Sequence, residues 1–191
     1  AVGAMVTGNV YAVAGLADAN GDPTDPGEGF DTFFGDHEYF THLEVGVISS
    51  YERRNLDNVH LTLWHTDERE EAQSPDDWGL AFSATTFIND RWLPFIRAGC
   101  ADGEAASLES MVSVGIGRYF AEHRDVLAVG VSWGEPSGDD LGDQYVAEAF
   151  YRLQLAQQVA ITPDVQVIVD PALRPDEDVI GVFGLRARLT F

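Results

Sequence analysis

Charged, amide and aromatic side chains recur at alternate positions in several otherwise apolar segments of this 191-residue chain. Arg186 and Arg188, for example, alternate with Leu185 and Leu189 near the C-terminus. The planar fork of an arginine can donate two hydrogen bonds to neighbouring hydroxyl groups, and an aromatic ring offers a flat apolar face. We therefore predict that these side chains line one polar wall and can contact a solute there, with these candidate residues: Glu44, His60, Trp64, Arg97, Glu148, Arg152, Gln154, Asp164, Gln166, Arg186 and Arg188. A simpler interpretation, which the sequence leaves open, is that these groups solvate a wet wall and pair with one another.

Other kinds of chemistry find less support in the spacing of the residues. A catalytic serine needs a histidine beside it, and Ser110 and Ser113 have no obvious histidine partner in the sequence, although a fold can bring distant residues together. Cys100 is the single cysteine, which excludes an internal disulfide and a cysteine metal cluster. The five histidines lack the spacing of metal ligands. We therefore expect no enzyme, no metal and no cofactor.

The elements that position the candidate residues are predicted to be strands. Apolar residues alternate with polar or small ones, and helical periodicity is absent throughout. No apolar run approaches the roughly 18 residues that a membrane helix requires, so membrane residence would need a closed sheet. The fold class is therefore all-β, an antiparallel transmembrane β-barrel. Ten strands are predicted between turn signals: 2–16, 39–50, 58–67, 78–88, 92–101, 108–120, 126–134, 144–155, 159–169 and 179–191.

The connections between these strands alternate in length. If Phe191 lies at the periplasmic rim of a barrel, every second connection should be a short turn and the others longer loops. On one side, 89–91, 121–125 and 156–158 are short and 51–57 is somewhat longer; the intervening connections, 17–38, 68–77, 102–107, 135–143 and 171–178, are mostly longer. A soluble sandwich that binds a ligand has no reason to alternate in this way, so the pattern argues against that fold.

Charge and aromatic residues follow the same two-sided plan. The net charge is −21, from 32 acidic residues and 11 arginines without a lysine, which argues against nucleic acid as a partner. Acidic residues crowd the longer loops, while arginines lie beside the short turns. The acidic excess fits either solubility or a saline habitat on the one hand, or the binding of divalent cations at a lipopolysaccharide surface on the other, and both interpretations remain open. Two aromatic girdles are predicted near the strand ends, one from Tyr39, Phe40, Trp78, Trp133 and Tyr145 and one from Tyr51, Trp92, Tyr119, Phe120 and Phe191.

Five blocks of sequence resemble the carbohydrate-selective porin family of the OprB type. They are Asp18-Ala-Asn-Gly-Asp-Pro, Gly29-Phe-Asp-Thr-Phe-Phe, Asp57-Asn-Val-His-Leu-Thr-Leu-Trp-His, Phe87-Ile-Asn-Asp-Arg-Trp-Leu-Pro-Phe and Ile161-Thr-Pro-Asp-Val-Gln. The resemblance implies a channel in the bacterial outer membrane, surrounded by lipid and lipopolysaccharide, that admits glucose and other small sugars by diffusion. It also implies a barrel of about sixteen strands. Residues 1–191 would then form a single β-barrel domain that is the C-terminal part of a larger barrel.

Two other functions remain compatible with the sequence. The first is a general porin for ions and small solutes without sugar preference, which would differ only in the residues that line the pore. The second, less favoured, is a barrel enzyme that acts on lipid and needs a serine and a histidine close together on the lipid face. The preferred sugar, the full number of strands and the oligomeric state cannot be derived from the sequence.

Overall fold

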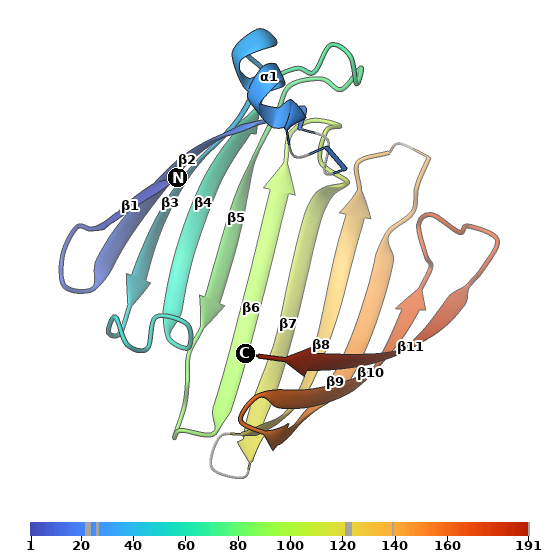
Figure 1. Ribbon diagram of the computed structural model, residues 1–191. Coiled ribbons are helices and arrows are strands. Elements are labelled where there is room, and N and C mark those ends of the chain that lie inside the picture. The colour runs from blue at the N-terminus through green and yellow to red at the C-terminus, as the bar shows by residue number, and fades with distance from the viewer. Residues whose placement is uncertain (22–23, 26, 121–123, 139, 191) are drawn as a thin grey trace.

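A single antiparallel sheet forms almost the whole of the computed structural model, which describes residues 1–21, 24–25, 27–120, 124–138 and 140–190. Eleven strands follow one another in chain order, and each is hydrogen-bonded to the next (Figure 1). Phe191, the predicted end of the last strand, lies outside the described residues. The strands are β1 (Val2–Met5), β2 (Val10–Asp18), β3 (Tyr39–Ile48), β4 (Asn58–Thr66), β5 (Asp77–Thr85), β6 (Trp92–Ala101), β7 (Leu108–Phe120), β8 (Asp125–Pro136), β9 (Gln144–Ala156), β10 (Val159–Val169) and β11 (Val179–Leu189).

The first predicted strand, 2–16, is in fact a hairpin of β1 and β2, so the prediction of ten strands was one too few. The hydroxyl of Thr7 accepts hydrogen bonds from the backbone N–H groups of Asn9 and Val10, at 3.3 and 3.1 Å. The side chain of Asn9 donates to the carbonyl of Ile48 at 2.9 Å, which ties the turn to β3. Threonine, glycine and asparagine in succession are a turn signal of the kind that short polar side chains stabilise, and this signal was overlooked.

The prediction that helical structure is absent was also wrong. Helix α1 (Glu28–Gly35) lies within the predicted loop 17–38. Eight residues make about two turns, which is too short for a helical period to stand out in the sequence. Thr32 donates a hydrogen bond to Asp18 at 2.7 Å, and the ring of Phe33 packs against that of Tyr39 with centroids 5.0 Å apart. Among the described residues, no helix is long and apolar enough to cross a membrane.

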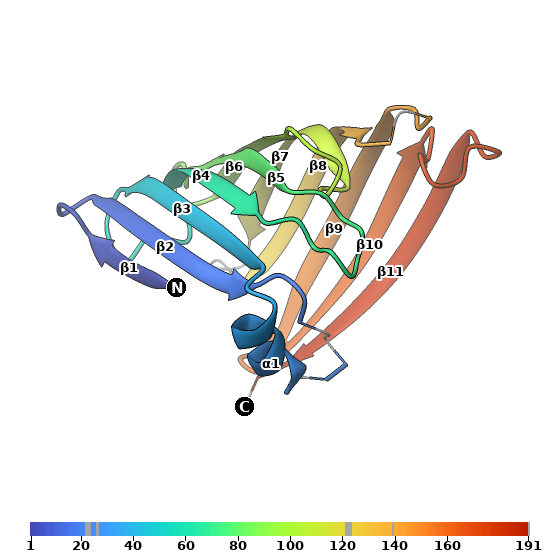
Figure 2. The ribbon, with the colours of Figure 1, turned by 90° about the horizontal axis from the view of Figure 1, so that it is seen from above.

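The sheet bends into an arch, with α1 on its hollow side (Figure 2). Residues opposite each other in an antiparallel sheet share a face, so the pairing sorts every strand residue. One face carries polar, aromatic and small residues, and the most buried apolar residues, Ile48, Val126, Ala128 and Ala160, all belong to it. We call it the concave face. The opposite, convex face exposes Leu43, Val45, Leu61, Phe82, Ile96, Val114, Val129, Val131, Val165, Val167, Phe183 and Leu185.

The convex face has no layer of protein packed on it in the described part of the chain. Phe183 is 85% exposed and Leu185 is 76% exposed. A continuous apolar surface of this kind suits contact with lipid, and it would be unfavourable in water. Together with the antiparallel sheet, it confirms the predicted fold class, while closure into a complete barrel is not seen within the described residues, because β1 and β11 each have one unpaired edge.

The connections at one end of the sheet are mostly shorter than those at the other, as predicted, with one exception: 49–57 is longer than the loops 102–107 and 137–143 at the opposite end. We call the end with connections 6–9, 49–57, 86–91, 121–124 and 157–158 the turn rim. The loop rim carries 19–38, 67–76, 102–107, 137–143 and 170–178. Acidic residues dominate the described loop rim, for example Glu70, Asp102 and Asp176. The turn rim carries charges of both signs, because Glu52 and Asp90 lie among its arginines. From the sequence, only arginines were predicted at this end.

At the loop rim, the buried carboxylate of Asp77 holds the connection between β6 and β7. Asp77 is only 2% exposed, and its two oxygens accept hydrogen bonds from the backbone N–H groups of Gly103 at 2.8 Å and Ala106 at 2.9 Å. A side chain at position 103 would press against this carboxyl group, since a Cβ there would lie 2.9 Å from its carbon. Asp77 thus anchors the loop 102–107, which two further side-chain hydrogen bonds also hold: from Trp78 Nε1 to Asp102 at 3.1 Å and from the Ser137 hydroxyl to the carbonyl of Ala106 at 2.6 Å.

At the turn rim, Asp57 joins the turn 49–57 to the turn 86–91. Its carboxylate accepts hydrogen bonds from the hydroxyls of Ser49 (3.1 Å) and Thr86 (3.0 Å), from the backbone N–H of Phe87 (2.7 Å) and from the guanidinium of Arg53. Partial burial raises the pKa of Asp57, but these hydrogen bonds outweigh it and hold the pKa below its ordinary value. The ionised carboxylate is thus the form that links the two turns.

Candidate functional site

All eleven predicted binding residues lie on the concave face. The pairing shows this directly, since Glu44 is opposite Thr62, Arg97 is opposite Ser83 and Ser113, and Glu148 is opposite Gln166. They form two separate groups along the strand order, with Arg97 on β6 between them. The group on β3 and β4 contains Glu44, His60 and Trp64, and the group on β9 to β11 contains Glu148, Arg152, Gln154, Asp164, Gln166, Arg186 and Arg188.

A hydrogen-bond network crosses the concave face of β2, β3 and β4. The hydroxyl of Tyr11 donates to Glu44 at 2.8 Å and lies 3.2 Å from the amide of Asn58. Thr62 donates to the other oxygen of Glu44 at 3.1 Å, and a ring nitrogen of His60 lies 3.2 Å from the oxygen of Asn58. The network fixes one carboxylate, one phenol and one amide side by side, so that their remaining hydrogen-bonding positions are held in place.

Nearer the loop rim, the same strands carry stacked aromatic rings, which we call the aromatic platform (Phe40 and Trp64). The two rings are 6.2 Å apart and inclined by 23°. His42 lies beside Phe40 at 6.1 Å. The Trp64 ring covers Gly79 of β5, where a Cβ would lie 2.5 Å from ring carbon Cζ2. The prediction that Phe40 belongs to an interfacial girdle is wrong, because the register places this residue on the concave face opposite Thr66. It is wrong for Tyr119 for the same reason, since Tyr119 is opposite Val126 of the concave face.

Between the two groups, the concave face of β5 to β8 is built mainly from small residues. Gly115 of β7 and Gly130 of β8 are opposite each other, and Ser113 donates a hydrogen bond to Ser132 at 2.8 Å. The ring of Phe95 lies over Gly115, where an added Cβ would be 2.5 Å from it. Arg97 extends over the Phe95 ring, with its guanidinium carbon 5.8 Å from the centroid. This part of the concave face thus consists mostly of small side chains, and the large ones occupy only a few positions.

The group on β9 to β11 combines three arginines with two acidic residues and two amides. Among the described residues, no ion pair within 4.0 Å joins Arg152, Arg186 or Arg188 to an acidic group. The Nε of Arg152 is buried and has no hydrogen-bond partner in the part of the chain that the structure describes. The suggestion that these groups simply pair with one another therefore finds no support here.

Gln154 has a different place from the rest of its group. Its amide nitrogen donates to the backbone carbonyls of Ala156 at 2.7 Å and Val159 at 3.3 Å. These contacts hold the turn between β9 and β10, so this nitrogen is already engaged. Its use in binding a solute stays a prediction.

Several residues of the concave face were missed by the sequence analysis, namely Tyr11, Phe40, His42, Asn58, Thr62 and Phe95. The alternation itself could have found five of them, because each is in phase with a candidate of the same strand: Phe40 and His42 with Glu44, Asn58 and Thr62 with His60 and Trp64, and Phe95 with Arg97. Tyr11 was hidden by the overlooked hairpin. No local signal shows that Tyr11 and Asn58 meet, since they are 47 residues apart in the chain.

Comparisons with known proteins agree with this architecture. The profile of the carbohydrate-selective porin family, OprB, matches residues 95–191. Porin AaxA of Chlamydia pneumoniae is 24% identical over 144 residues, which are 70% of this chain and 33% of that protein. The high-pH structure of Pseudomonas putida OprB superimposes with a TM-score of 0.74 and 15% identity, over 99% of this chain and 57% of that one. The chain thus spans a third of the curated relative and just over half of the solved structure.

Proposed function

Because the chain belongs to the OprB family of carbohydrate-selective porins, we propose that it forms much of the wall of a bacterial outer-membrane channel that admits small sugars by diffusion. The observation that carries the proposal is the concave face of β2 to β4. There the aromatic platform lies next to the hydrogen-bonded group of Glu44, Tyr11 and Thr62. A sugar ring presents apolar faces and a rim of hydroxyls, so planes and polar groups side by side match both.

We further propose that additional strands of the same protein close the barrel. The outer edges of β1 and β11 are unpaired among the described residues. An exposed strand edge leaves backbone polar groups without partners, which costs several kcal/mol per group in hydrocarbon, on the order of the penalty for any unsatisfied amide. The protein with its closed barrel is called the intact porin below.

A general porin is the second candidate, favoured by the acidic loop rim and by the arginines of β9 to β11 that lack an ion pair within 4.0 Å in the described chain. Charged groups of this kind would act on ions of either sign and would show no preference among uncharged solutes of equal size. The family and the fold point to a transport channel, so both candidates pass a solute without chemical change.

The experiment compares glucose with an uncharged amino acid of similar size in liposome swelling. The double variant Phe40→Ala with Trp64→Ala should lower the ratio of the glucose rate to the amino-acid rate, because it removes the two aromatic rings of the platform and leaves the strands of the barrel intact. Trp133→Ala is the matched control, since Trp133 lies near the loop rim on the convex face. A wild-type channel with no preference for glucose, or a ratio that the double variant leaves unchanged, would favour the general porin.

A further inference from the structure

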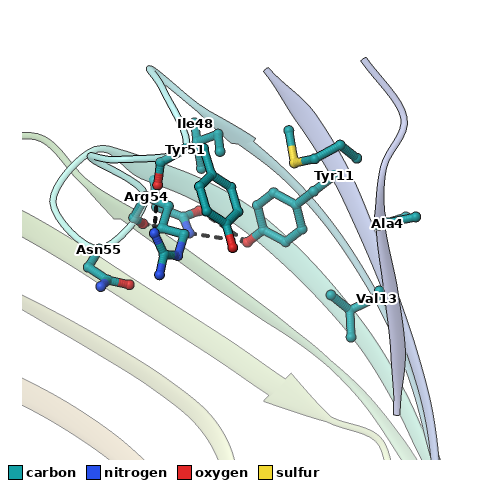
Figure 3. Close-up of a pocket in the computed structure, with 11 residues that line it drawn as sticks. Ala4, Tyr11, Val13, Ile48, Tyr51, Arg54 and Asn55 are labelled. Atoms are coloured by element: carbon teal, nitrogen blue, oxygen red, sulfur yellow. Dashed lines mark hydrogen bonds between the residues drawn. The ribbon is translucent and has the colours of Figure 1, made fainter. Parts of the chain in front are cut away.

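A pocket of about 290 Å³ lies at the turn rim, away from the aromatic platform (Figure 3). Its wall combines β1, β2 and the turn 49–57, which contributes Tyr51, Arg54 and Asn55. Tyr11 and Asn58 of the concave face complete the polar part. Small-molecule pockets usually measure about 300 to 1,000 Å³, so this one has room for a single sugar ring and no more.

The turn 49–57 presents a guanidinium in a fixed position. The guanidinium carbon of Arg54 lies 4.3 Å from the centroid of the Tyr51 ring, and one of its nitrogens, Nη1, donates to the backbone carbonyl of Tyr51 at 2.8 Å. Asn58 donates to the backbone carbonyl of Arg54 at 3.3 Å, which ties the turn to β4. In the described chain, the other guanidinium nitrogens have no protein partner and remain available as donors.

The pocket also offers an aromatic plane and a hydroxyl. Tyr51 is 64% exposed, so much of its ring is free for contact. The Tyr11 ring lies flat over Gly46, where any side chain would collide with it, and this places its hydroxyl between Glu44 and Asn58. No carboxylate lines the pocket, so a neutral solute meets no buried acidic group there.

We propose that this pocket is a monosaccharide subsite at the turn rim, where Arg54 donates to neighbouring hydroxyls and Tyr51 contacts the ring. The inference rests on the proposed sugar passage and adds a second contact point to it, at the opposite end of β2 to β4 from the aromatic platform. A solute that leaves the platform towards the turn rim would meet this subsite before it reaches open water.

The test uses the intact porin in planar lipid bilayers, with glucose added on one side at a time and the ion current recorded. Arg54→Gln and Tyr51→Leu should each raise the glucose dissociation constant measured from the turn-rim side by about three- to tenfold, the effect of one lost hydrogen bond or contact. Tyr51→Phe keeps the ring and should stay within about twofold of wild type. The matched control is Arg118→Gln, because Arg118 also stacks on rings at the turn rim, those of Trp92 and Phe120, but lies on the convex face.

The outcomes separate the two proposals. If wild type responds to glucose but Arg54→Gln and Tyr51→Leu both stay within about twofold of it, while their ion conductance is normal, the subsite is wrong and the proposed function stands. An equal loss in Arg118→Gln would also overturn the subsite, because a general effect of the rim would explain it. A wild-type channel that conducts ions without any response to glucose would overturn the proposed function and, with it, the subsite.

Discussion

Glycines decide where the large side chains of the concave face can lie. Gly79 is covered by the Trp64 ring and by a backbone carbonyl of β6, and Gly46 is covered by the ring of Tyr11. Both rings can lie flat against the sheet only because no Cβ stands beneath them. These positions therefore shape the candidate site without offering a contact of their own to a solute.

We expect Gly79→Ala to destabilise the intact porin by about 1 to 3 kcal/mol, since the added methyl forces Trp64 or the backbone to move. The free energy of unfolding in detergent, followed by denaturant titration, checks this. Gly181→Ala in β11 is the matched control, because an added Cβ there would meet nothing within 4 Å. Equal losses in the two variants would show that the cost comes from the strand backbone and not from the ring.

For the strands, the alternation of residues with period two was enough to predict which face of the sheet each side chain occupies. It assigned all eleven candidate residues to one face, because parity is a local property of a strand. It could not show which residues meet, since the contact between Asp77 and Gly103 or between Asp57 and Phe87 depends on the stagger of neighbouring strands. Helix α1 was missed because it is too short for a periodic signal, and the β1–β2 hairpin was missed because the turn signal of Thr7, Gly8 and Asn9 was overlooked.

The link between two turns by Asp57 makes a prediction about pH. The pKa of Asp57 is lower in the folded protein than in the unfolded chain, where it is about 3.9. The ionised Asp57 therefore stabilises the fold at pH values above its unfolded-state pKa, and this stabilisation is lost as the pH falls through its folded-state pKa. Asp57→Asn should lower the free energy of unfolding by about 1 to 3 kcal/mol at pH 7. The difference from wild type should shrink below about pH 4.

Denaturant titrations of both proteins at pH 7 and pH 3 measure this difference. Asp90→Asn is the control, because Asp90 lies in the neighbouring turn with its side chain 73% exposed and only a 3.8 Å contact to Arg53. A constant difference at both pH values would mean that the carboxylate charge is not what holds the turns together.

In the molecule as a whole, the convex face of the sheet is apolar and the concave face is more polar. Val131 is 55% exposed on the convex face, and its chain neighbour Ser132 lies on the concave face. If the convex face meets lipid, Val131→Arg should destabilise the intact porin by about 2 to 4 kcal/mol, the cost of an arginine near the bilayer midplane. Ser132→Arg should cost much less, because its side chain points to the wet side.

Folding into lipid vesicles, read from the change in gel mobility between unboiled and boiled samples, compares the two variants. Equal effects would contradict the assignment of the faces. Identical mobility of the boiled and unboiled wild type, together with full solubility without detergent, would contradict membrane residence altogether.

The uneven distribution of charge between the two rims has an electrical consequence. In the intact porin, the acidic loop rim would gather cations at one mouth, while the mixed turn rim would gather few at the other. A pore with one charged mouth conducts unequally under opposite voltages, as a diode does. This rectification would fade in concentrated salt, because the Debye length falls from about 10 Å at 0.1 M to about 3 Å at 1 M. Uncharged sugars would cross equally well in both directions. The same channel would therefore rectify the ion current but show no directional preference for sugars.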